Sequence, residues 1–121
     1  MAMNVDVVDR TELAPAAALF RSLGDPTRLA IVRHLAQGPA RVVDLVTESG
    51  LAQSTVSKHL ACLRDCGLLV SEPVGRSSVF RLAEPSLLNV LVAAETVLAA
   101  TGSAVVLCPT YGSAAGEQAG S

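Results

Sequence analysis

Three cysteines are the residues of this 121-residue sequence whose type and spacing most directly suggest chemistry, at positions Cys62, Cys66 and Cys108. Cys62 and Cys66 are four residues apart in a segment with helical periodicity, which places them on one helix face with Cβ atoms about 5–6 Å apart. Small rotamer changes bring two thiolates at that spacing onto one metal ion, because zinc–sulfur bonds are about 2.3 Å and those of larger ions somewhat longer. An odd number of cysteines without a secretion signal predicts reduced thiols.

Two other interpretations of the Cys62–Cys66 pair remain open. A free cysteine is often a small buried apolar residue, which would make the pair part of the core. The pair could also be a redox switch, although Cys66 falls at the end of its predicted helix, where the negative end of the helix dipole disfavours a thiolate. A divalent metal ion would itself supply the positive charge that favours deprotonation.

Polar residues ahead of the cysteines on the same predicted helix are suited to contact with DNA. At about 100° per residue, Val56, Leu60 and Leu63 form an apolar stripe, and the polar side chains fall on the opposite side. Glutamine can pair with adenine, hydroxyls contact bases or phosphates, and lysine neutralises phosphate. The candidate DNA-contacting residues are Gln53, Ser54, Thr55, Ser57 and Lys58, together with Arg76 at the tip of a predicted hairpin.

The elements that must position these residues follow from periodicity, caps and turn residues. We expect helices over 11–24, from Pro26 to Gly38 with Asp25 as N-cap, over 42–50, over 53–66 and from a cap at Glu84-Pro85-Ser86 to about 101, with strands over 68–72 and 77–82. This order predicts a mainly α fold with a β-hairpin wing, the winged helix-turn-helix. The predicted division is an N-terminal extension (1–10), a winged helix-turn-helix domain with dimerisation helices (11–101) and a C-terminal tail (102–121) that carries Cys108, with 112–121 disordered.

Composition excludes several classes of protein. Half of the residues are hydrophobic but only 2% are aromatic, so the core must consist of Leu, Val and Ala on helices. The apolar stretch 87–107 is interrupted by Asn89, Glu95 and Thr96 and is too polar for a membrane span, and the first ten residues lack the apolar segment of a secretory signal. We therefore expect a cytoplasmic protein. It is not expected to be an enzyme, because we find no catalytic triad or Cys/His arrangement, no glycine-rich phosphate loop and no paired catalytic carboxylates.

Charge is unevenly distributed along the chain. The net charge is −2, yet the segment 21–81 holds eight basic residues against five acidic ones, and the flanking segments are acidic. This distribution permits a DNA-binding face in the middle of the chain without requiring one.

The segments LFRSLGDPTRLAIVRHLAQGP and LAQSTVSKHLACLRDCGLLVSEPVGRSSVFRL resemble the ArsR/SmtB family of metal-sensing winged-helix repressors over about residues 15–100. The resemblance implies a homodimer formed by the first and last helices, and repression of an operator that is relieved when metal binds. Ala52 departs from the family, which usually has serine as the N-cap of the recognition helix. His59 matches the family's HLxxL segment, and we interpret it as structural rather than as a ligand.

The resemblance also narrows the choice of metal site. The chain lacks a Cys-x-Cys before Asp44-Leu45, and its last helix offers Glu95 but no histidine, so two sites used in the family are missing. Cys62-x-x-x-Cys66 is similar to the cadmium- and lead-sensing (CmtR-like) branch, which implies a third thiolate from the partner subunit's C-terminal region, a role that suits Cys108.

These observations predict a repressor that needs no cofactor to bind double-stranded operator DNA and is released by Cd(II) or Pb(II). Arsenite or antimonite, which also accept three sulfurs, are the main alternative inducers. An alternative function that does not involve metal sensing is that of a constitutive or redox-responsive DNA-binding repressor, in which the cysteines are not ligands.

Overall fold

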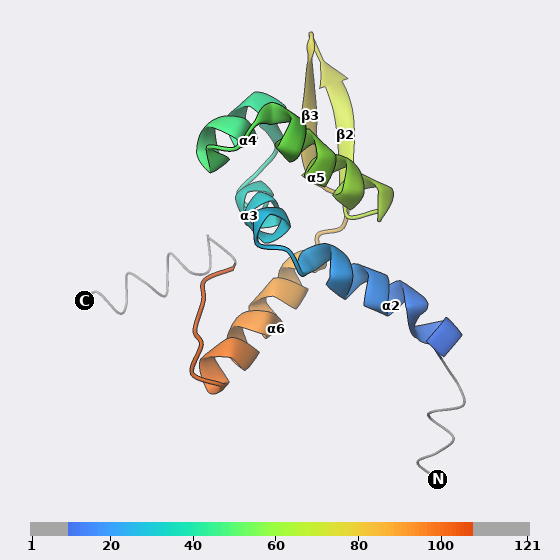
Figure 1. Cartoon of the computed structure of the whole chain (residues 1–121), viewed down its shortest axis with the longest axis vertical. Helices are drawn as coiled ribbons and strands as arrows, with labels where there is room; N and C mark the ends of the chain where they lie inside the picture. Colours follow the sequence, from blue (N-terminus) through green and yellow to red (C-terminus); the bar gives the residue numbers. More distant parts are fainter. Residues whose placement is uncertain (1–9, 108–121) are drawn as a thin grey trace, which may run out of the picture.

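Five helices and one antiparallel sheet make up residues 10–107, the part of the chain that the computed structural model describes (Figure 1). In chain order they are α2 (Arg10–Leu23), α3 (Pro26–Leu35), β1 (Ala40–Arg41), α4 (Val42–Ser49), α5 (Gln53–Asp65), β2 (Leu69–Val74), β3 (Ser77–Leu82) and α6 (Leu87–Ala100). Helices α4 and α5 form the helix-turn-helix and strands β2 and β3 the wing. The predicted winged helix-turn-helix is therefore confirmed.

The core is built around the apolar stripe of α5. Val56, Leu60 and Leu63 are 0%, 1% and 0% exposed, so the stripe predicted from helical periodicity is fully buried. It belongs to one cluster that also includes Val32 of α3 and Leu69 of β2. Because the buried stripe fixes the rotation of α5 about its own axis, it also fixes which side chains of this helix face outward.

Local hydrogen bonds account for the ends of α3 and α5. Asp25 caps α3 as predicted: its carboxylate accepts a hydrogen bond of 3.0 Å from the Arg28 backbone N–H, and this bond lowers the pKa of Asp25 below its ordinary value. Helix α5 ends where Gly67 adopts a φ of +82°, which lets the Leu68 N–H reach the carbonyl of Leu63 at 3.0 Å.

The wing is a hairpin with a two-residue turn. Strands β2 and β3 are in register from Leu69–Leu82 to Val74–Ser77, which leaves Gly75 and Arg76 as the turn. Gly75 has a φ of +63°, the conformation for which a hairpin turn of this kind selects glycine. The sequence predicted only these two strands.

Two features differ from the sequence prediction, and a third was not predicted. Strand β1 adds a third strand, pairing Ala40 with Phe80, and at two residues it is too short to show an alternating pattern. Helix α6 begins at the expected place, but Ser86 does not cap it, because its hydroxyl donates to Glu84 Oε2 at 3.1 Å instead.

The third feature, about which the sequence made no prediction, is the course of the residues that follow α6. Residues 103–107, here called the C-terminal strap, run back along α6 (Figure 1). Arg33 Nη1 donates to the Val106 carbonyl at 3.1 Å, the Leu107 N–H donates to Glu95, and the Leu107 side chain is buried. The strap is thus tied to both α3 and α6.

Helix α5 has an unfilled N-cap. Ala52 has the extended backbone of an N-cap residue (φ −65°, ψ 148°) but no side-chain oxygen to accept a hydrogen bond. We expect Ala52→Ser to raise the free energy of unfolding by about 1 kcal/mol in urea denaturation. The control is Ala30→Ser, inside α3, where serine has no free N–H to cap and should lower stability slightly. Equal effects at the two positions would contradict the explanation.

Candidate DNA-binding surface and thiol site

The predicted DNA-contacting residues lie at the first turns of α5 and at the wing tip. Gln53, Ser54, Thr55 and Lys58 are exposed, whereas Ser57 is half-buried, and Arg76 is exposed in the β2–β3 turn. Figure 1 shows the beginning of α5 and the wing tip in the upper half of the molecule, at the end opposite to α6. The two parts of the predicted surface therefore share one end of the fold.

Two basic side chains of this surface are available to phosphate. Among residues 10–107, neither Lys58 nor Arg76 has an ion-pair partner. By contrast, Arg41 pairs with Asp44 at 3.2 Å and lowers the pKa of that carboxyl. Because an unpaired cation need not break an existing contact to meet a phosphate, Lys58 and Arg76 are the strongest candidates for backbone contacts.

The predicted thiol pair lies at the other end of α5. Cys62 is half-buried on the last turns, and Cys66 is the exposed residue that ends the helix, its N–H bonding to the Cys62 carbonyl at 3.1 Å. Both are free thiols. Neither cysteine is among the buried core residues, so the interpretation of the pair as core packing loses its main support.

The third predicted ligand, Cys108, lies outside the described residues. Within residues 10–107 no group of three or more His, Cys, Asp or Glu side chains is placed to hold a metal ion. Of the three predicted ligands, the described residues therefore include two thiols, which lie one helical turn apart on α5. These suit a thiophilic ion that takes its remaining ligand from elsewhere.

Sequence reasoning missed Ser22, which contacts the thiol site from α2. Its Oγ lies 2.9 Å from the Cys66 Sγ, and its side chain is buried. The two residues are 44 positions apart, and a serine in an apolar helix gives no local sign of such a contact.

Arg28 of α3 contacts both α2 and α5 near this region. Its Nε donates to the Ser22 carbonyl at 2.6 Å, its Nη2 donates to the Arg21 carbonyl at 3.2 Å, and its Nη1 lies 3.4 Å from His59 Nδ1. His59 Nδ1 is also 4.0 Å from Asp25 Oδ2. These contacts agree with the structural role expected for His59.

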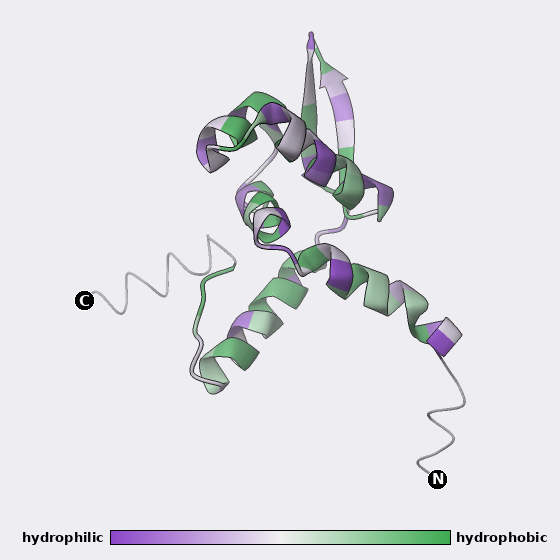
Figure 2. Ribbon diagram, in the orientation of Figure 1, coloured by the Kyte–Doolittle hydropathy of each residue, from purple (hydrophilic) through white to green (hydrophobic). Residues whose placement is uncertain are grey.

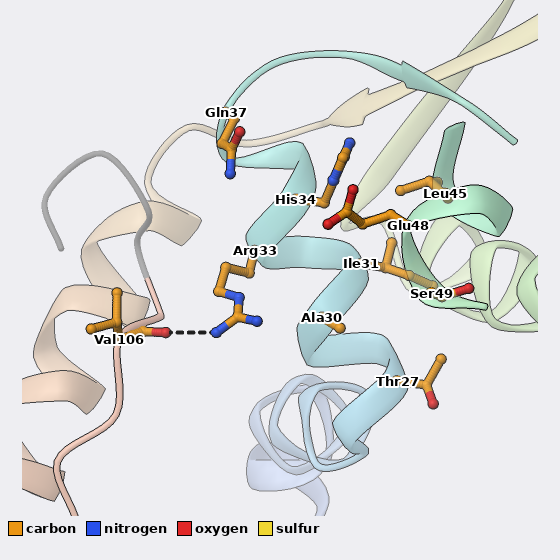
Figure 3. Close-up of a pocket in the computed structure, with 10 residues that line it drawn as sticks. All are labelled: Thr27, Ala30, Ile31, Arg33, His34, Gln37, Leu45, Glu48, Ser49 and Val106. Carbon is orange, nitrogen blue, oxygen red and sulfur yellow. Dashed lines mark hydrogen bonds between the residues drawn. The ribbon is translucent and has the colours of Figure 1, made fainter. Parts of the chain in front are cut away.

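A cavity of about 500 Å³ lies between α3 and α4, beside the strap (Figure 3). Ile31 and Leu45 line its apolar part, and His34 and Glu48 point into it from facing helices. The Arg33–Val106 hydrogen bond lies along its other side. None of the residues predicted for DNA or metal binding lines this cavity.

Known proteins resemble the chain in both sequence and structure. The family described as "Bacterial regulatory protein, arsR family" matches residues 25–71, from the α3 cap to strand β2. The "Probable mercury resistance operon repressor" of Streptomyces lividans is 33% identical over 102 residues, which cover 84% of this chain and 81% of that protein. The chain belongs to the ArsR family.

Two solved structures extend the similarity to the fold of this ArsR-family protein. The NMR structure of the cadmium metal-sensor CmtR from Mycobacterium tuberculosis is 42% identical, with a TM-score of 0.55 over 64% of this chain and 80% of that one. The crystal structure of M. tuberculosis Rv0081 is 27% identical, with a TM-score of 0.72 over 78% of this chain and 95% of that one.

Family membership confirms two expectations from the sequence. The ArsR-family chain is a helix-turn-helix transcriptional regulator that binds DNA, and its relatives are regulators rather than enzymes. No helix within residues 10–107 combines the length and apolar character needed to cross a membrane.

Lys58→Ala and Arg76→Ala should each weaken DNA binding and reduce the slope of log affinity against log salt by about one phosphate contact. A suitable probe is a duplex selected by the wild-type protein from a random-sequence pool, with affinity measured by fluorescence anisotropy at several salt concentrations. Arg64→Ala, at the opposite end of α5 and paired with Asp65 at 3.6 Å, is the control that should leave the slope unchanged. Wild-type slopes in both test variants would show that this surface does not contact DNA.

Proposed function

We propose that this ArsR-family regulator is a metal-responsive repressor whose DNA affinity is controlled by cysteine thiolates. It binds operator DNA as a homodimer when metal-free and leaves it when Cys62, Cys66 and Cys108 capture a soft metal ion. The observation that carries the proposal is the thiol pair on α5, the helix whose first turns hold the candidate DNA-contacting residues. A rigid helix that bears both sites can transmit a change at one end to the other.

The position of the C-terminal strap favours a third thiolate from the partner subunit. The strap is held against α3 and α6 through Val106 and Leu107. Figure 1 shows the strap and the C-terminal end of α5 on opposite sides of α3 in that view. We therefore propose that Cys108 completes the thiol site of the partner subunit rather than that of its own chain.

Ligand chemistry and the comparisons support cadmium or lead as the inducer. Thiolates without imidazole favour large thiophilic ions. The similar protein from M. tuberculosis is described as a cadmium sensor, which supports this choice. The similar protein from S. lividans is described as a probable mercury resistance operon repressor, which does not favour cadmium or lead over mercury. Arsenite and antimonite use the same three-sulfur chemistry and are compared directly in the test.

Exposed apolar side chains on α2 and α6 support the homodimer. Leu13 and Phe20 of α2 are 60% and 62% exposed, and Val97 of α6 is 61% exposed. Figure 2 shows α6 coloured as hydrophobic over most of its length, with one end of this helix next to α2. Apolar surface of this kind on adjacent helices favours association with a second copy.

Cadmium titration of the reduced protein tests the sensor. We expect ultraviolet thiolate-to-metal absorption of about three sulfurs per metal, and a fall in DNA affinity of about 5–150-fold, measured on the selected duplex. Lead, arsenite and antimonite are titrated in parallel to rank the inducers.

Cysteine variants assign the ligands. Cys62→Ser and Cys66→Ser should each abolish tight binding of cadmium, so that the protein–DNA complex stays intact when cadmium is added. Cys108→Ser should do less, because the two thiolates of α5 remain. If all three variants still leave DNA when cadmium is added, the cysteines are not the sensor.

Sedimentation tests the dimer. At micromolar concentration the wild-type protein should sediment at twice the mass of a single chain, and Phe20→Glu should shift it toward the monomer because the charge must be desolvated at the interface. Val43→Glu, at a 54% exposed position of α4, is the matched control and should leave the dimer intact. A monomeric wild type would contradict the proposed assembly.

A further inference from the structure

Ser22 is the buried polar side chain of the described core, at 5% exposed. Its hydroxyl faces the thiol of Cys66, with Oγ and Sγ 2.9 Å apart and either atom able to donate. A buried hydroxyl retains its partner because losing it would leave a desolvated polar group unsatisfied. The contact therefore fixes where the hydroxyl of α2 points.

The backbone of Ser22 is also held in place. Its carbonyl accepts a hydrogen bond of 2.6 Å from Arg28 Nε, and the next residue, Leu23, is buried in the core. Arg28 itself is fixed through its backbone N–H, which donates to Asp25. The hydroxyl is thus presented to Cys66 by a rigid segment rather than by a mobile loop, which is the arrangement that makes an outer hydrogen bond effective at a ligand atom.

We propose that Ser22 is a positioning residue of the thiol site, and that its hydroxyl donates a hydrogen bond to the Cys66 sulfur when that sulfur holds a metal ion. This rests on the proposed function. A metal-bound thiolate has no proton, so it can only accept, and the hydroxyl becomes the donor. When the metal binds, the Cys66 thiol releases its proton to water, and the Ser22 hydroxyl keeps its proton.

The position of Cys66 explains why a donor is useful there. Cys66 ends α5, where the carbonyl groups of the last turn disfavour negative charge on the sulfur. A hydroxyl donor from another helix offsets part of that repulsion. Among the described residues Cys62 has no hydrogen bond of this kind, so the two sulfurs of the pair are not equivalent.

Ser22→Ala is the direct test. Alanine removes the donor while favouring the helix, and the exposed Cys66 thiol can turn to water, so the variant should fold. Competition with a chelator should show cadmium affinity falling about 10-fold. The thiolate-to-metal absorption should move to longer wavelength, because a sulfur that has lost a hydrogen bond holds its electrons less tightly.

Two further variants separate positioning from a general structural effect. Ser22→Thr keeps the hydroxyl and should restore both the affinity and the absorption wavelength. Thr96→Ala removes a hydroxyl that bonds to the Val92 carbonyl on α6 and should change neither. Thermal unfolding of the metal-free proteins checks that all variants are folded.

The outcomes distinguish this proposal from the one on which it rests. If the wild-type protein shows no thiolate-to-metal absorption, the proposed sensor itself fails. If the wild type shows it and Ser22→Ala matches the wild type in both affinity and wavelength, the sensor stands and the role of Ser22 is refuted. A loss of affinity at unchanged wavelength that threonine does not rescue also refutes it, since that result indicates a structural effect alone.

Discussion

Burial of the apolar stripe of α5 is the constraint on which the functional surface depends. Val56, Leu60 and Leu63 are almost completely inaccessible to solvent, so α5 cannot rotate about its axis without exposing them. Since side chains follow one another at fixed angles around a helix, burial of this stripe sets the direction in which every other side chain of α5 points. It turns the polar first turns outward and leaves Cys62 and Cys66 at the boundary between core and solvent.

Arg28 adds a polar link to this apolar framework. Its guanidinium donates to the last carbonyls of α2 and lies beside His59 of α5, while its backbone contributes to the cap of α3. Carbonyl groups at helix ends have acceptor capacity that the helix does not fill, and a planar guanidinium with several donors can bond two of them at once. The same residue therefore fixes the mutual position of the thiol-bearing helix and the helix that presents Ser22.

The core contains few large side chains, so the hydrogen bonds between helices have a larger part in setting how the helices are positioned relative to one another. Apart from Phe80, its buried apolar side chains are leucine, isoleucine, valine and alanine. Apolar burial is non-directional, so a core of this kind holds helices together without specifying fine geometry. Directional contacts such as Arg28–Ser22 and Ser22–Cys66 supply that geometry at the joints between α2, α3 and α5.

Local sequence signals determined the helices, the hairpin and the rotation of α5. Each signal acts within a few residues: the Asp25 cap, the glycines that end α4 and α5, the spacing of Val56, Leu60 and Leu63, and the Gly75 turn. The spacing of Cys62 and Cys66 likewise placed both thiols on one helix, and the motifs around them indicated the family.

Only the tertiary structure decided the features that join distant segments. Strand β1 exists because Ala40 pairs with Phe80, the strap is held because Arg33 meets Val106, and Ser22 faces Cys66 across 44 positions. The sequence around each of these residues contains no pattern from which its distant partner could be predicted. At Ser86 the local pattern predicted a helix cap that the structure does not form, because the Ser86 hydroxyl donates to Glu84 instead. The sequence determined what each segment becomes, and packing decided which side chains meet, because long-range contacts depend on the assembled core.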